Sequence, residues 1–152
     1  MNASEGAAER HPIGYWLKLV DRLIDQGFDA VLGSAAVTPR HWQILNLLEN
    51  GPASYAQIDD EAAPYLAPHM PTVRPVVDDL CNRGWATSAG TDRVTLTETG
   101  VKALSDIQSR VAADRQRVTE GITDAEYRAA VEVLARMATN LGWREERDMG
   151  PV

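Results

Sequence analysis

The sequence has little of what disulfides, membrane spans and secretion need. Cys81 is the only cysteine among 152 residues, so an internal disulfide and a cluster of cysteine metal ligands are excluded. No apolar run reaches the roughly 20 residues that a membrane-spanning helix requires. The first ten residues hold neither a basic stretch nor an apolar segment, so we expect no secretory signal. These absences predict a cytoplasmic protein with no membrane partner.

Motifs for catalysis are also missing from the sequence. It holds no glycine-rich phosphate loop, no nucleophile elbow and no histidine–glutamate metal motif. The three histidines, His11, His41 and His69, lie in separate segments without the spacing of metal ligands. We therefore expect no catalytic residue, no bound metal and no cofactor, and we do not expect an enzyme.

The charge of the chain is acidic, with a formal net charge of −7. Residues 38–100 carry four arginines against eight carboxylates, which makes this segment strongly acidic. A nucleic-acid-binding protein usually presents a basic patch to the phosphates. Any contact with DNA through this segment must therefore depend on few positive side chains.

Both ends of the chain show the periodicity of long amphipathic helices. In residues 10–36, apolar side chains recur every three or four positions around a face too broad for a surface helix. Residues 98–143 repeat the pattern, with a break at Gly121 and a capping box at Thr123 and Glu126. Such faces need a partner, so we predict that both segments form dimerisation helices. We expect residues 144–152 to be a flexible tail.

The middle of the chain, residues 38–97, reads as three short helices followed by a hairpin. Thr38-Pro39 is typical of a helix start, and Ser54 with Gln57 forms a capping box. A third apolar stripe runs from Val73 to a stop at Gly84, and two short strands follow it. We therefore predict a mainly α fold, a winged helix-turn-helix flanked by N- and C-terminal dimerisation helices, in a single domain.

Several segments resemble the MarR (multiple antibiotic resistance regulator) family: Thr38–Leu45, Ser54–Ile58, Val73–Gly84, Arg93–Gly100 and Gly121–Tyr127. The resemblance implies a homodimeric transcriptional repressor that binds an inverted-repeat operator in double-stranded DNA. Each recognition helix would enter a major groove, and each wing would reach a minor groove. The resemblance also implies that a small aromatic ligand releases the DNA.

Specific residues carry these expectations. The implied DNA contacts are Ser54, Gln57, Thr72, Arg74, Arg83 and Arg93. The implied ligand-binding residues are Tyr15, His41 and Tyr65, which combine flat apolar surfaces with hydrogen-bonding tips.

Several of these residues allow a second interpretation. Arg74 could contact a guanine or pair with Asp78 four residues later, and Arg93 could reach DNA or pair with Asp92. Asp78 and Asp79 could accept hydrogen bonds from cytosine, although a solvated helix face is the simpler interpretation. Cys81 lies on an apolar stripe, which favours a buried structural role over a redox-sensing thiol.

The acidic middle segment keeps a second function open. A winged-helix protein can bind a protein partner or a small molecule and have weak or no affinity for DNA. Arg74-Pro75 stands where the family usually has Thr-Arg, and the wing between Thr87 and Arg93 is short. Both departures favour this alternative.

Overall fold

The computed structural model describes residues 3–62 and 72–145. The chain divides into two compact units, residues 1–115 and residues 116–152, and each is described by itself. The elements are α1 (Ala3–Ala8), α2 (Ile13–Ser34), α3 (Pro39–Glu49), β1 (Ala53–Ser54), α4 (Tyr55–Ala62), α5 (Arg74–Asn82), β2 (Ala86–Ser88), β3 (Arg93–Leu96), α6 (Glu98–Val118) and α7 (Asp124–Asn140). The predicted mainly α winged helix is confirmed. The six-residue helix α1 was not predicted from the sequence.

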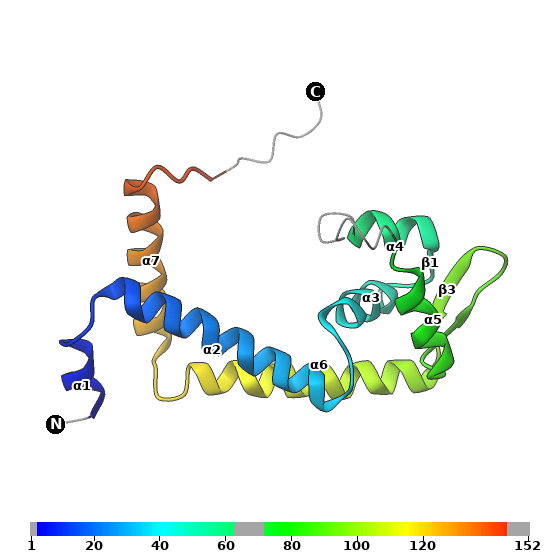
Figure 1. The fold of residues 1–152 in the computed structure, drawn as a ribbon, viewed down its shortest axis with the longest axis horizontal. Coiled ribbons are helices and arrows are strands. Elements are labelled where there is room, and N and C mark those ends of the chain that lie inside the picture. The colour runs from blue at the N-terminus through cyan, green and yellow to red at the C-terminus, as the bar shows by residue number, and fades with distance from the viewer. Residues whose placement is uncertain (1–2, 63–71, 146–152) are drawn as a thin grey trace. The chain divides into compact units, whose positions relative to one another are not determined.

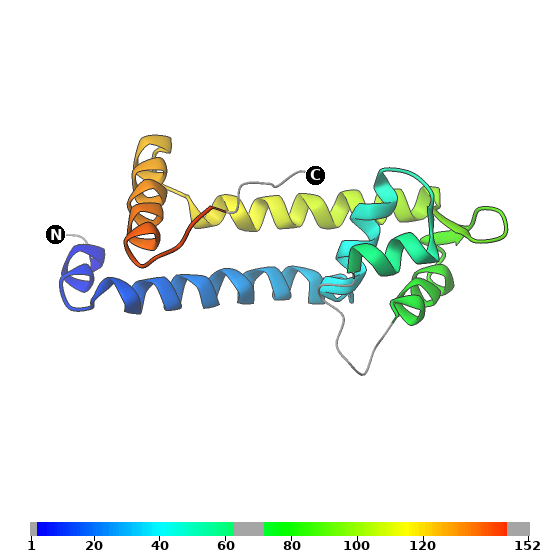
Figure 2. The same cartoon turned by 90° about the horizontal axis from the view of Figure 1, so that it is seen from above.

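The long helices α2 and α6 lie alongside each other within the first unit (Figures 1 and 2). Arg110 of α6 donates a hydrogen bond to the Ser34 hydroxyl at 3.1 Å. Farther along, the Asp114 carboxylate lies against Gly27, where an added Cβ would be 2.7 Å from it. The absence of a side chain at Gly27 therefore lets the two helices approach closely.

Local capping signals fix where the short helices begin. Thr38 caps α3 as predicted, and Pro39 occupies the first turn. The Ser54 hydroxyl accepts from the Gln57 N–H at 3.1 Å, while Gln57 accepts from the Ser54 N–H at 2.8 Å. Two capping boxes were predicted, Ser54 with Gln57 at the start of α4 and Thr123 with Glu126 at the start of α7. Both are confirmed.

The sheet has three strands in the order β1-β3-β2, all antiparallel. The predicted hairpin is present as β2 and β3, but the sequence analysis missed β1. Ala53 pairs with Val94, and Ser54 pairs with Arg93. The base of the wing is therefore tied to the segment that leads into α4.

The contacts at the junction between the wing and α6 explain why threonine and glycine occur in the segment from Leu96 to Gly100. The Thr97 N–H donates to the Trp85 carbonyl at 3.0 Å, and the Thr97 hydroxyl accepts from the Gly100 N–H at 3.0 Å. A Cβ at Gly100 would overlap the Trp85 carbonyl oxygen and lie 2.7 Å from its carbon. Only glycine fits here, because the obstacle is backbone rather than a flexible side chain.

One core fills the middle of the first unit. It joins the C-terminal end of α2, the three short helices, the sheet and one face of α6. Its fully buried large side chains are Leu32, Ile44, Leu45, Ile58, Val73, Val77, Leu80, Val94, Leu104 and Ile107.

The second unit contains α7, whose apolar side chains remain exposed. Tyr127, Val131 and Leu134 are 53%, 47% and 37% exposed, and no described residue of α7 is buried. Within the second unit, no described residue covers this face. Among the described helices, none is long and apolar enough to cross a membrane.

Candidate nucleic-acid interface

The candidate interface is built on α5, the predicted recognition helix. Asp59 of α4 fixes where α5 begins, because its carboxylate accepts from the Val73 N–H at 2.8 Å and from the Thr72 hydroxyl at 3.0 Å. The Thr72 hydroxyl in turn accepts from the Arg74 N–H at 3.1 Å. Thr72, a predicted DNA contact, is thus engaged in capping the helix. Sequence reasoning did not identify Asp59 as its partner.

Arg74 projects from the exposed first turn of α5. Its guanidinium carbon lies 4.3 Å from the centre of the Tyr55 ring, a cation–π contact with the first residue of α4. No ion pair joins Arg74 to Asp78, although both lie in the described part of the chain. The aromatic ring therefore holds the guanidinium in place while leaving its N–H groups available.

Arg93 lies at the start of β3, next to the N-terminus of α4. Its guanidinium donates to the Pro52 carbonyl at 3.1 Å, and in the described part of the chain it does not pair with Asp92. Ser54, its strand partner, and Gln57 have their side chains in the capping box of α4. The structure thus brings Arg93, Ser54 and Gln57 together at one end of α4.

Arg83 follows the last residue of α5, and its guanidinium binds other groups of the same chain. Its Nε donates to Asp79 Oδ2 at 2.7 Å, and Nη2 donates to the Ala36 carbonyl at 2.8 Å. Asp79 Oδ2 also lies 2.8 Å from His41 Nε2 of α3. The solvated-face interpretation holds for the exposed Asp78 but is wrong for Asp79. The sequence pattern could not reveal this carboxylate's role, because His41 lies 38 residues away.

The electrostatics of Asp79 follow from these contacts. The hydrogen bond from His41 lowers the pKa of Asp79, burial opposes this shift, and Arg83 lowers the pKa further. The carboxylate is therefore ionised at neutral pH and binds the Arg83 side chain, which leaves less of that guanidinium for phosphate.

Two of the predicted ligand residues, Tyr15 and His41, do not meet in one copy of the chain. Tyr15 stacks on His11 with ring centres 4.1 Å apart, near the start of α2, while His41 follows the other end of that helix. At 1.5 Å per residue, Tyr15 and Ser34 are about 28 Å apart along the axis. Tyr65 lies outside the described residues. Tyr15 and His41 therefore do not line one pocket within a single copy, because the length of α2 separates them.

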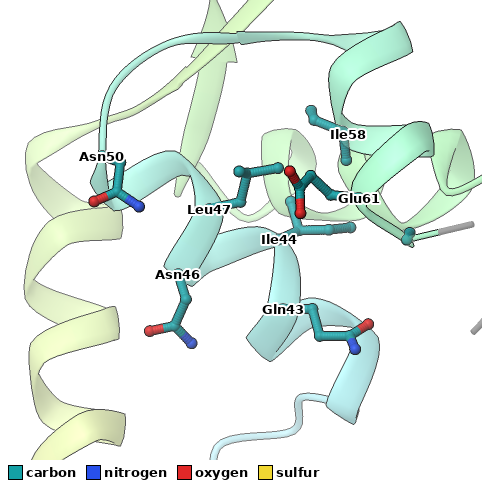
Figure 3. A pocket seen from close by; sticks show the side chains of 8 residues that line it. Gln43, Ile44, Asn46, Leu47, Asn50, Ile58 and Glu61 are labelled. Atoms are coloured by element: carbon teal, nitrogen blue, oxygen red, sulfur yellow. The ribbon is translucent and has the colours of Figure 1, made fainter. Parts of the chain in front are cut away.

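The structure contains a hollow that the sequence analysis missed, between α3 and α4 (Figure 3). It has a volume of about 350 Å³ and combines an apolar floor with amide side chains and one carboxylate. Its lining residues are Gln43, Ile44, Asn46, Leu47, Asn50, Ile58, Glu61 and Ala62. Among the described residues, none of the predicted DNA or ligand residues lines it. The described residues also hold no cluster of potential metal ligands.

The sequence matches no protein-family model and no curated protein. Solved structures do match along most of the chain. A MarR family protein from Mycobacterium tuberculosis is 23% identical with a TM-score of 0.63, covering 88% of this chain and 98% of that one. The chain has the MarR fold.

Two further MarR-fold neighbours give the same picture. The transcriptional repressor CouR is 24% identical with a TM-score of 0.59, covering 84% of this chain and 93% of its own. NadR in complex with 4-hydroxyphenylacetate is 22% identical with a TM-score of 0.58, covering 84% and 96%. The predicted resemblance is thereby confirmed at the level of the fold.

Cys81 of this MarR fold is expected to be a poor nucleophile. Burial raises the pKa of its thiol, and the charge of Asp78 raises it further, so little thiolate forms near neutral pH. We expect the native protein to react with a thiol-specific reagent at least ten times more slowly than the urea-unfolded chain at pH 8. Equal rates would contradict the structural role predicted for Cys81.

Proposed function

We propose that the chain is a homodimeric, DNA-binding transcriptional repressor that a small aromatic ligand releases from its operator. The observation that carries the proposal is the exposed first turn of α5 in a MarR fold. There Arg74 is held on the Tyr55 ring with its N–H groups available for a guanine or a phosphate. Arg93 supplies a second cation at the base of the wing.

The homodimer is supported by apolar surface that each unit, taken by itself, leaves exposed. Most of these side chains lie in the first half of α2 and in the second unit, mainly on α7. Their exposed fractions range from 37% to 89%, and a patch of this kind is expected to bind a partner. In these two regions they are Ile13, Tyr15, Leu17, Val20, Leu23, Ile24, Val118, Ile122, Tyr127, Val131, Val133, Leu134, Met137, Leu141 and Trp143.

The ligand part of the proposal rests on the aromatic surface of α2. NadR has been solved with 4-hydroxyphenylacetate, a phenolic carboxylate. In this chain Tyr15 is 45% exposed beside Lys18 and Arg22, which line a shallow hollow with it. His41 is assigned a structural role, because both of its ring nitrogens have protein partners.

The acidic middle segment supports a second candidate, a winged-helix protein that binds a protein partner. Of the four arginines in residues 38–100, Arg83 is engaged by Asp79. Binding to the DNA that flanks the gene separates the two candidates. A fragment bound at low salt, with affinity that falls modestly as salt rises, supports the repressor. If the protein binds this fragment no more tightly than unrelated DNA at 50 mM salt, the result favours the protein-partner candidate.

Replacing Arg74 by alanine is expected to weaken operator binding about 5- to 150-fold, since one bidentate base contact contributes about 1–3 kcal/mol. Binding to unrelated DNA should fall by less. The loss of one positive charge weakens binding to the two DNAs alike, but only operator binding also loses the base contact. Fluorescence anisotropy with the two DNAs measures the ratio.

Arg128→Ala provides the control for Arg74→Ala. Arg128 is an exposed arginine of α7, so its loss changes the net charge equally without touching α5. Equal affinities for Arg74→Ala and wild-type protein would show that α5 does not read the DNA as proposed.

A further inference from the structure

Four groups connect α5 to the helices that precede it. They are the His41 ring, the Asp79 carboxylate, the Arg83 guanidinium and the Ala36 carbonyl, and we refer to them as the clamp. Asp79 Oδ2 lies 2.8 Å from His41 Nε2 and 2.7 Å from Arg83 Nε, so one carboxylate oxygen accepts from both side chains. Arg83 Nη2 then reaches the Ala36 carbonyl at 2.8 Å. The clamp thus spans α3, α5 and the turn after α2.

The hydrogen bonds of His41 determine its role in the clamp. The Thr38 N–H donates to Nδ1 at 3.1 Å, so Nδ1 is the unprotonated nitrogen and Nε2–H donates to Asp79. The same ring therefore completes the capping box of α3 and binds α5. Because His41 is 8% exposed, it cannot turn to another partner without leaving both.

The other end of the clamp lies on an unusual turn. Ala36 has a φ of +54°, the only described non-glycine residue with a left-handed backbone. The turn is closed by the Val37 N–H, which donates to the Leu32 carbonyl at 3.1 Å. Arg83 binds the carbonyl of the strained residue itself. The end of α2 and the end of α5 are therefore joined through one guanidinium.

We propose that Asp79 and Arg83 are positioning residues that transmit the placement of α2 to the recognition helix, and thereby set operator specificity. The inference rests on the proposed function. Arg83 acts through Asp79 and Ala36 rather than by contacting DNA, since its Nε and Nη2 are used and its guanidinium carbon lies 5.2 Å from the centre of the Trp85 ring. A shift of the turn after α2 moves α5 with it.

The test compares Asp79→Asn with Asp78→Asn. The two variants make the same chemical change at adjacent positions of α5, and both reduce the repulsion of phosphate, but only Asp79 belongs to the clamp. We expect Asp79→Asn to lower the ratio of affinities for operator and scrambled DNA at least tenfold, while Asp78→Asn changes it less than threefold. Hydrogen exchange of the α5 amides in the free protein should accelerate at least tenfold in Asp79→Asn only.

Arg83→Lys is the second variant, in case Asp79→Asn fails to fold. Lysine keeps the charge, but its single nitrogen cannot hold both the Asp79 carboxylate and the Ala36 carbonyl as the guanidinium does. It should therefore reproduce the loss of specificity while retaining affinity for scrambled DNA. Combining it with Asp79→Asn should add little, because both changes break one unit.

The outcomes separate the inference from the proposed function. If Asp79→Asn and Arg83→Lys match Asp78→Asn in specificity and exchange, the clamp does not position α5. If Arg83→Lys loses affinity for all DNA equally while Asp79→Asn does not, Arg83 contacts phosphate directly and the inference is wrong. If the wild-type protein shows no operator preference, the proposed function fails. Hydrogen exchange of the α5 amides then decides by itself whether the clamp holds α5 in place.

Discussion

Replacing Gly100 by alanine is expected to destabilise the winged helix by about 3 kcal/mol or more. The added Cβ would overlap the Trp85 carbonyl, and that carbonyl already accepts the Thr97 N–H. Neither group can move without separating α6 from β2. Chemical denaturation followed by circular dichroism measures the change, and we expect the transition midpoint to fall accordingly.

Gly33→Ala is the matched control for Gly100→Ala. Gly33 is also helical, but a Cβ there would meet nothing within 4 Å. The substitution should be neutral or stabilising by up to about 1 kcal/mol, because alanine is the better helix former. Similar stability of the two variants would refute the close packing of α6 on Trp85.

Leu134→Asp is expected to convert the proposed dimer into a monomer and to abolish operator binding. Leu134 lies on the exposed apolar face of α7 with Tyr127 and Val131. A carboxylate in an apolar interface must be desolvated without a partner, which costs several kcal/mol, and a symmetric dimer pays this cost in both copies. Sedimentation at micromolar concentration gives the mass, and anisotropy gives the loss of DNA binding.

Thr139→Asp is the control, placed on the same helix about 140° around its axis from Leu134. It adds the same carboxylate to the polar side, and it changes helix propensity little because threonine and aspartate are similar helix formers. The control should remain dimeric and bind the operator. A wild-type protein that sediments as a monomer at this concentration would remove the basis for the dimer altogether.

The sequence could predict those parts of the fold that depend on neighbouring residues. The starts of α3, α4 and α7 follow from a capping residue and a partner three positions later, and the apolar period locates α2 and α6. The strand β1 escaped because it has two residues and is defined only by pairing with β3, about 40 residues farther along. Its local sequence holds no signal of that pairing.

The candidate site was harder to predict for the same reason. Arg74 could be placed because exposure on a helix face follows from the apolar stripe. Thr72 was chosen as a hydroxyl and Arg83 as a cation that could contact DNA. Tertiary packing, however, gives Thr72 the partner Asp59 and Arg83 the partner Ala36. Charge and position along the chain do not indicate whether a polar side chain is already engaged.

The short strand β1 also bears on how copies of this protein can meet. It makes β3 the central strand, so the outer strands of the described sheet are β1 and β2, of two and three residues. Such brief edges offer too few unpaired backbone groups to recruit a strand from another molecule. Self-association by sheet extension, a common route to aggregation, is thereby discouraged, which leaves the helix side chains for the contact between copies that we propose.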